Sequence, residues 1–159
     1  MSFSITSINN ANPNDTANVL ILKSINNHYF CISKDAAIKS IVINDMIENL
    51  GDTDEPIPLF NNSCTSEYLQ KVLFFLDYIH NNQSSTDELK EWVDSKGYTG
   101  NLPEWFAQYI NVDQPTLFGI VLIADFLHIQ ILIDFGCLTI ANQIKHMNPE
   151  EIHQVFSNN

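Results

Sequence analysis

Short runs of β-type residues precede the helical part of this chain. NVLILK (18–23) and HYFCIS (28–33) are rich in β-branched and aromatic residues, and Asn26-Asn27 lies in the turn between them. Because asparagine tolerates positive φ, the two runs predict a β-hairpin. PIPLF (56–60) carries two prolines, which lack a backbone N–H, so we expect it at a sheet edge or a strand end.

Helical periodicity dominates the remainder of the sequence. Residues 34–51 indicate one or two helices, with Ser40 as an internal N-cap and Gly51 as a stop. Residues 66–80 give the clearest helix, because their apolar positions recur at steps of three and four: Leu69, Val72, Leu73, Leu76 and Ile79. Residues 81–102 form a polar connection that can hold a short helix of its own.

Three more helix starts follow. Pro103 fits the first turn of PEWFAQYI, and Asp113 with Pro115 marks the start of TLFGIVLIADFL. Asn148-Pro149 is a cap followed by a first-turn proline, with two acids next to it at the positive end of the helix dipole. These signals predict a C-terminal third made of helices.

Residues 117–135 are nearly long and apolar enough to cross a bilayer. Four polar residues interrupt them, and lipid penalises each acid by about 2.5 to 3.5 kcal/mol at the bilayer centre: Asp125, His128, Gln130 and Asp134. We therefore interpret the segment as a buried helical pair and expect no membrane partner.

Residues 131–145 read as a helix that is apolar on two sides. At about 100° per residue, Ile131, Phe135 and Leu138 share one side, and the other carries Ile133, Cys137, Ile140, Ala141 and Ile144. Either the helix is the centre of a larger core or one side receives a partner. We favour the partner, because little chain follows. The short apolar helix after Pro149 must also dock on something, and it can line the same groove.

Composition narrows the classes of partner and of chemistry. The net charge is −12 and all seven basic residues are lysines, which argues against nucleic acid and anionic membranes. The acidity serves either solubility or a basic partner. Three cysteines in apolar sequence indicate a reducing compartment, the cytoplasm or the nucleus. Residues 1–17 are polar and Asn-rich, so we expect a disordered tail.

We find no pattern that predicts catalysis. The five glycines form no phosphate-binding loop, and the five histidines show no metal-ligand spacing with the cysteines, so we expect no cofactor and no metal. Cys137 lies within an apolar helix face without a basic neighbour to lower its pKa, which favours inert packing. The sequence therefore favours an interaction module over an enzyme.

The C-terminal motifs resemble one family. VDQPTLFGIVLIADFLHI (112–129), LIDFGCLTIANQIK (132–145) and NPEEIHQVF (148–156) are similar, in order and without gaps, to runs of the Skp family. These S-phase kinase-associated adaptors link F-box proteins to a cullin in SCF ubiquitin ligases. The similarity extends to VLIL, to AIKSIVINDMIENLG and to PIPL in the N-terminal half.

The resemblance implies an α+β, BTB/POZ fold. A small three-stranded sheet flanked by helices would occupy residues 18–127, and helices that bind the F-box would occupy residues 128–159. It also implies that residues 117–145 form two helices that break near residues 128–130.

The resemblance further implies two binding surfaces. Asp125-Phe126 stands where the family presents an Asn-Tyr pair to the cullin N-terminal domain. The F-box would contact Ile140, Ile144, Ile152 and Phe156. Pro149 matches a proline that some protist relatives hydroxylate and glycosylate. In the family a further acidic, Trp-containing helix usually follows, and we expect it to be missing here because the sequence given ends at Asn159.

Three expectations therefore stand beside one another. The first is a non-catalytic adaptor that joins an F-box protein to a cullin in ubiquitin-dependent degradation. The second is a decoy that binds F-box proteins without a cullin, motivated by Asp125-Phe126. The third is an elongin-C-like or self-associating BTB module, against which residues 131–156 count because elongin-C-type chains lack them. A weak homodimer is also expected.

Overall fold

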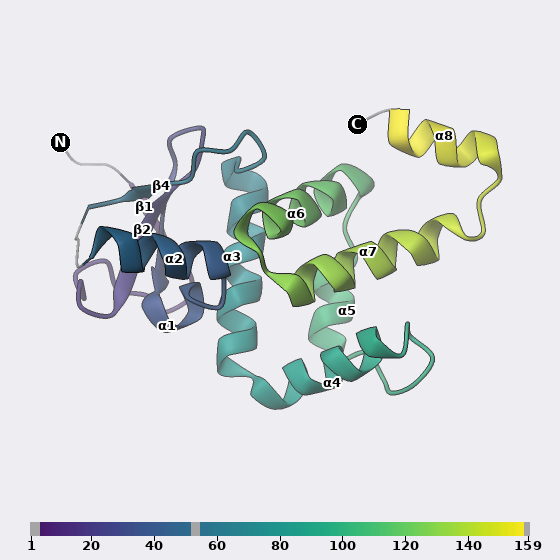
Figure 1. Cartoon of the computed structure of the whole chain (residues 1–159), viewed down its shortest axis with the longest axis horizontal. Coiled ribbons are helices and arrows are strands. Elements are labelled where there is room, and N and C mark those ends of the chain that lie inside the picture. The colour runs from purple at the N-terminus through teal and green to yellow at the C-terminus, as the bar shows by residue number, and fades with distance from the viewer. Residues whose placement is uncertain (1–3, 52–54, 158–159) are drawn as a thin grey trace.

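The computed structural model describes residues 4–51 and 55–157. One four-stranded sheet lies at one end of the molecule and helices make up the rest (Figure 1). The strand order is β1-β3-β2-β4. The strands are β1 (Ile5–Ser7), β2 (Val19–Lys23), β3 (Tyr29–Ser33) and β4 (Ile57–Pro58). The predicted α+β class is confirmed.

The predicted hairpin is the centre of the sheet. β2 and β3 pair antiparallel, with Ile21 opposite Cys31. The Ser24 hydroxyl accepts a hydrogen bond from the His28 backbone N–H at 2.9 Å, and Asn27 takes a φ of 66°. β4 lies at the sheet edge, as its prolines predict, because it pairs only with β2 in the part of the chain that the structure describes.

The N-terminal segment differs from the predicted tail. Residues 5–7 form β1, which pairs parallel with β3, and Ile8 is 1% exposed within the core. The sheet therefore has four strands where three were expected. The Asn-rich composition that suggested disorder belongs to residues 9–18, which form turns after Ile8. Residues 1–3 lie outside the described residues.

Two short helices follow the hairpin. α1 (Lys34–Ala37) and α2 (Ile41–Leu50) are separated at Ser40, whose hydroxyl accepts from the Ile43 N–H at 3.1 Å. Gly51 closes α2 with a φ of 71°, a conformation that favours glycine. The predicted internal cap and the predicted stop are both confirmed.

The core surrounds α3 (Ser66–Asn81), whose predicted apolar stripe is buried. α4 (Gln83–Asp94) occupies the predicted polar connection, and α5 (Glu104–Ile110) follows Pro103. The aromatic rings of α5 pack on α3. Trp105 stacks between Tyr78 and Tyr109 with ring centroids 3.8 Å and 5.1 Å away, and the Tyr109 hydroxyl donates to the Lys71 carbonyl at 2.8 Å.

Three helices complete the chain: α6 (Gln114–Leu127), α7 (Gln130–Ile144) and α8 (Pro149–Ser157). His128 is left-handed, with a φ of 51°, and ends α6 where the resemblance implied a break. Within residues 4–51 and 55–157, no single helix is long and apolar enough to cross a membrane. α5 and α6 together would have the length and composition, but they bend by 109°.

Candidate functional site

α6 has one buried side and one apolar side that faces outward. Gly119, Ile120, Ile123, Ala124 and Leu127 are buried. Phe118, Leu122 and Phe126 recur at steps of four and therefore share the opposite side. Leu122 is 58% exposed, whereas Phe118 and Phe126 are half-buried. The helix thus keeps a row of large apolar side chains at the surface.

The C-terminal end of α6 is fixed by a bond to α2. The buried Ser40 hydroxyl donates to the Leu127 carbonyl at 2.6 Å while it caps α2. The end that carries Asp125 and Phe126 is therefore held beside the start of α2, as Figure 1 shows. Asp125 is exposed, and Ile41, the first residue of α2, is 59% exposed.

α7 packs on the rest of the chain through its first half. Leu132, Phe135 and Gly136 are buried, and the Phe135 ring meets the rings of Trp92 and Phe106 edge-on at 5.9 Å and 6.1 Å. A Cβ on Gly136 would lie 2.4 Å from a methyl of Val121, so this glycine permits the close approach of α6. The buried face runs between the two predicted apolar sides.

The second half of α7 and all of α8 lack a core of their own. No side chain in residues 137–157 is buried. This segment, here named the C-terminal arm, nevertheless carries seven large apolar side chains: Leu138, Ile140, Ile144, Met147, Ile152, Val155 and Phe156. Ile140 packs partly against the core, whereas Cys137 and Ala141 on the same side are exposed. The predicted second apolar side of α7 is thus left incompletely covered.

α8 begins as the sequence predicted. The Asn148 side chain accepts from the Glu151 N–H at 2.9 Å and donates to its carboxylate at 3.1 Å, which is a reciprocal cap. Pro149 is exposed in the first turn. The helix returns toward α6 (Figure 1). The ring centroids of Phe156 and Phe118 lie 5.6 Å apart.

The predicted site residues therefore fall in three places. Ile140 and Ile144 lie one turn apart on α7, and Ile152 and Phe156 lie one turn apart on α8. Asp125-Phe126 lies at the far end of α6. Sequence reasoning missed Phe118, which joins α8 to the body. The sequence feature that could have identified Phe118 is its spacing of four residues from Leu122, which is in turn four residues from Phe126. This spacing does not stand out because most residues of the helix are apolar.

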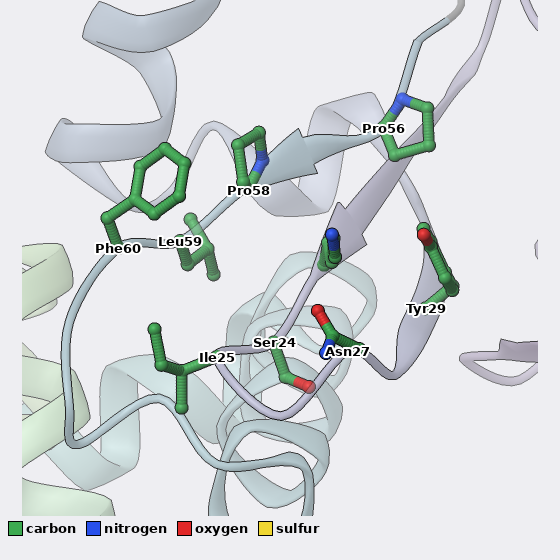
Figure 2. Close-up of a pocket in the computed structure, with 9 residues that line it drawn as sticks. Ser24, Ile25, Asn27, Tyr29, Pro56, Pro58, Leu59 and Phe60 are labelled. Atoms are coloured by element: carbon green, nitrogen blue, oxygen red, sulfur yellow. The ribbon is translucent and has the colours of Figure 1, made fainter.

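A cavity of about 310 Å³ lies between the hairpin turn and β4 (Figure 2). Phe60 at its rim is 81% exposed. Lys23 is the one charged side chain among the described residues that line the cavity, and its amino group lies 5.9 Å from the centroid of the Tyr29 ring. The described residues that line it include no acid–base pair. It is lined by Lys23, Ser24, Ile25, Asn27, Tyr29, Pro56, Pro58, Leu59 and Phe60.

The pKa of each of the three cysteine thiols is raised above its ordinary value. Burial raises the pKa of Cys64 to about 11, and burial also raises the pKa of Cys31. For Cys137 partial burial raises the pKa first, and the neighbouring Asp134 and Asp125 carboxylates raise it further. All three thiols therefore stay protonated at neutral pH. Among the described residues no group of His, Cys, Asp and Glu could hold a metal ion.

Two family models match the chain. Residues 18–82 match the Skp1 family, tetramerisation domain, and residues 130–157 match the Skp1 family, dimerisation domain. The first is a POZ domain model, so the predicted BTB/POZ fold is confirmed. The limits predicted for the two domains, 18–127 and 128–159, stay predictions.

Curated relatives cover most of the chain. The E3 ubiquitin ligase complex SCF subunit sconC of Arthroderma benhamiae is 38% identical over 140 residues, 88% of this chain and 83% of the relative. The SCF ubiquitin ligase complex protein SKP1a of Dictyostelium discoideum is 39% identical over 136 residues, 86% of this chain and 81% of the relative. The sconC subunit of Emericella nidulans is 39% identical over 139 residues, 87% of this chain and 83% of the relative.

Proposed function

The chain belongs to the Skp1 family, and from this premise we propose that it is a non-catalytic adaptor of an SCF-type E3 ubiquitin ligase. It joins an F-box protein, which selects the substrate, to the N-terminal domain of a cullin. The pathway it serves is ubiquitin-dependent protein degradation. Several relatives bear the names of SCF ligase subunits, which supports this assignment.

The observation that carries the proposal is the C-terminal arm. Residues 137–157 hold seven large apolar side chains and bury none of them. A surface of this kind in a folded domain is typical of a site that another protein covers. Ile144 and Ile152 supply aliphatic contacts and Phe156 an aromatic one, the mixture expected where amphipathic helices of a partner bind.

The cullin half of the proposal concerns the end of α6. Asp125 and Phe126 lie beside the start of α2, where Ile41 adds an exposed apolar side chain. This surface is separated from the arm along α6, so both partners can bind one chain. The fixed Ser40–Leu127 hydrogen bond keeps the surface preorganised, which lowers the entropy lost on binding.

The remaining features agree with an adaptor. Three protonated, unpaired thiols fit a reducing compartment, and we place the chain in the cytoplasm or the nucleus. Seven lysines and a net charge of −12 make nucleic acid and anionic lipid poor partners for this chain. Modification of the exposed Pro149 and weak self-association belong to the same proposal.

The F-box surface is tested with charge substitutions and matched neighbours. Ile144→Asp and Phe156→Asp should each weaken binding of an F-box peptide at least about 30-fold, the effect of losing a contact worth about 2 kcal/mol. Gln143→Asp and Gln154→Asp add the same charge at neighbouring polar positions and should change binding little. Isothermal titration measures all four, with circular dichroism as the folding check. If the folded wild-type chain binds no F-box peptide, the proposal is refuted.

The cullin surface is tested by the reverse substitutions. Asp125→Asn and Phe126→Tyr restore the amide and the hydroxyl of the resembling pair, and both sites are accessible enough to accept them. Under the adaptor proposal the unsubstituted chain already recruits a cullin N-terminal domain in a ternary complex with the F-box peptide. If only the doubly substituted chain does so, the chain is instead a decoy that holds F-box proteins away from the ligase.

A further inference from the structure

The outer edge of β3 carries a strand that lies outside the family match. The matched region begins at residue 18, whereas β1 occupies Ile5–Ser7. β1 pairs parallel with β3, so that Ile5 lies opposite Tyr29 and Ser7 opposite Cys31. The strand is therefore an addition to the sheet, made by the N-terminal segment of the same chain.

The β3 edge recognises this segment through its backbone and one apolar side chain. The Ile8 N–H donates to the Cys31 carbonyl at 2.8 Å and continues the ladder beyond β1. Ile8 is 1% exposed and joins the core cluster that contains Phe30 and Ile32. Thr6, on the same face but at the rim, is exposed. The edge thus binds an extended segment that has an apolar residue at the position of Ile8.

β1 is weakly held compared with β2 and β3, the two strands of the hairpin. It has three paired residues, and among residues 4–8 only Ile8 is buried. The ordering entropy of these residues offsets much of what one buried side chain and a few hydrogen bonds contribute. β1 is therefore expected to open locally far more often than β2 or β3.

The segment after Ile8 is long enough to carry β1 elsewhere. Residues 9–18 are ten residues of mostly exposed, Asn-rich turns that can extend to roughly 33 Å. Hydrogen bonds tie this segment to the body near both of its ends: the Asn9 side-chain amide donates to the Asp77 carboxylate, and the Asn18 carbonyl, next to β2, accepts from the Lys34 N–H. Once released, β1 can reach the same edge of a neighbouring molecule.

We propose that the outer edge of β3 is a strand-docking site whose second occupant is residues 4–8 of another copy of this chain. Two copies then associate by reciprocal exchange of β1. A second copy carries the segment, residues 4–8, that pairs with this edge within the chain itself. The opposite edge does not compete, because Pro58 in β4 and Pro56 just before it have no backbone N–H to donate. The C-terminal arm lies at the other end of the molecule and stays free (Figure 1).

A designed disulfide distinguishes exchange from the intramolecular pairing. Ser7 and Cys31 are direct partners in neighbouring strands, which places their Cα atoms about 5 Å apart and within disulfide range. The full chain with Ser7→Cys, and with Cys137→Ser to remove the exposed thiol, is equilibrated either dilute or near millimolar and then oxidised mildly. The matched control carries Thr6→Cys, whose side chain faces away from Cys31.

Exchange predicts an intrachain link in the dilute sample and a growing fraction of covalent dimer in the concentrated one. The intramolecular strand has an effective concentration in the millimolar range, so dimer appears only near that concentration. Mass spectrometry must map the interchain link to Cys31. A chain that links only internally at every concentration overturns the proposal, as does a Thr6→Cys control that gives as much dimer.

A second experiment makes the interchain link obligatory. One chain carries Ser7→Cys with Cys31→Ser and so has no thiol at position 31 with which to link internally. It is mixed with a chain that keeps both Ser7 and Cys31. Both carry Cys137→Ser, and urea unfolding checks that each is folded. A mixed dimer linked to Cys31 supports exchange. Its absence, when the Ser7→Cys chain of the first experiment links readily to its own Cys31, overturns exchange without affecting the adaptor proposal.

Discussion

Replacing Ser40 by alanine should destabilise the whole domain, because this hydroxyl serves two helices. It accepts from the Ile43 N–H at 3.1 Å as the N-cap of α2, and it donates to the Leu127 carbonyl at 2.6 Å at the end of α6. Ser40 is fully buried. Water cannot replace either bond without opening the contact between the two helices.

The expected loss follows from the two bonds. An N-cap serine replaced by alanine costs about 1 kcal/mol. A buried carbonyl left without its donor costs a further 1 to 3 kcal/mol, roughly. Ser40→Ala should therefore lower the free energy of unfolding by about 2 to 4 kcal/mol. Ser33 provides the matched control, since its hydroxyl caps α1 through one bond, from the Ala36 N–H at 3.2 Å.

Urea unfolding of the wild type, Ser40→Ala and Ser33→Ala measures the difference. We expect Ser33→Ala to lose only about 1 kcal/mol, so the excess for Ser40→Ala reports the bond to Leu127. The slope against urea should stay unchanged, which shows that the native and unfolded states are otherwise the same. Equal losses for the two variants would refute the idea that Ser40 ties α6 to α2.

Three further predictions concern single sites. Gly119→Ala should destabilise the chain by about 1 kcal/mol, because its Cβ would lie 2.4 Å from the Tyr68 ring. In a Tyr68→Ala background, thermal melts should show that Gly119→Ala no longer lowers the melting temperature. Hydrogen bonds from Thr116 lower the pKa of Asp113, so its charged form stabilises the fold. The difference in unfolding free energy between wild type and Asp113→Ala should therefore persist above about pH 4 and narrow as the pH falls below it. A difference that stays constant with pH would contradict this. Cys137 should react with a thiol reagent at pH 8 well before Cys64, and equal rates would contradict their exposures.

Local signals in the sequence predicted most of the elements. The hairpin, the cap at Ser40, the stop at Gly51 and the helix start at Asp113 each depend on neighbouring residues, and each is confirmed. β1 could not be predicted in this way. Its three residues gain their structure from pairing with β3, so the information lies 24 residues further along the chain rather than in residues 5–7 themselves.

The candidate site was predicted less completely for a similar reason. Periodicity indicated that α7 is apolar on two sides, and it placed Ile131 and Ile133 on opposite ones. Both pack partly against the core, because the buried face of Leu132 and Phe135 runs between them. Periodicity also could not show which neighbour α8 meets, since the contact of Phe156 with Phe118 joins two distant helices.

The weak attachment of α8 has a consequence for recognition by the arm. Nine residues are too few for a helix that is stable alone in water. The cap at Asn148 and the ring pair of Phe156 with Phe118 hold it, and such a ring pair contributes about 0.5 to 1.5 kcal/mol. α8 is therefore among the least stable elements of the fold and can reorient when a partner covers Ile144 and Ile152. The body that presents it stays rigid, so partners of different shape can be held by movement of α8 while the end of α6 keeps its geometry.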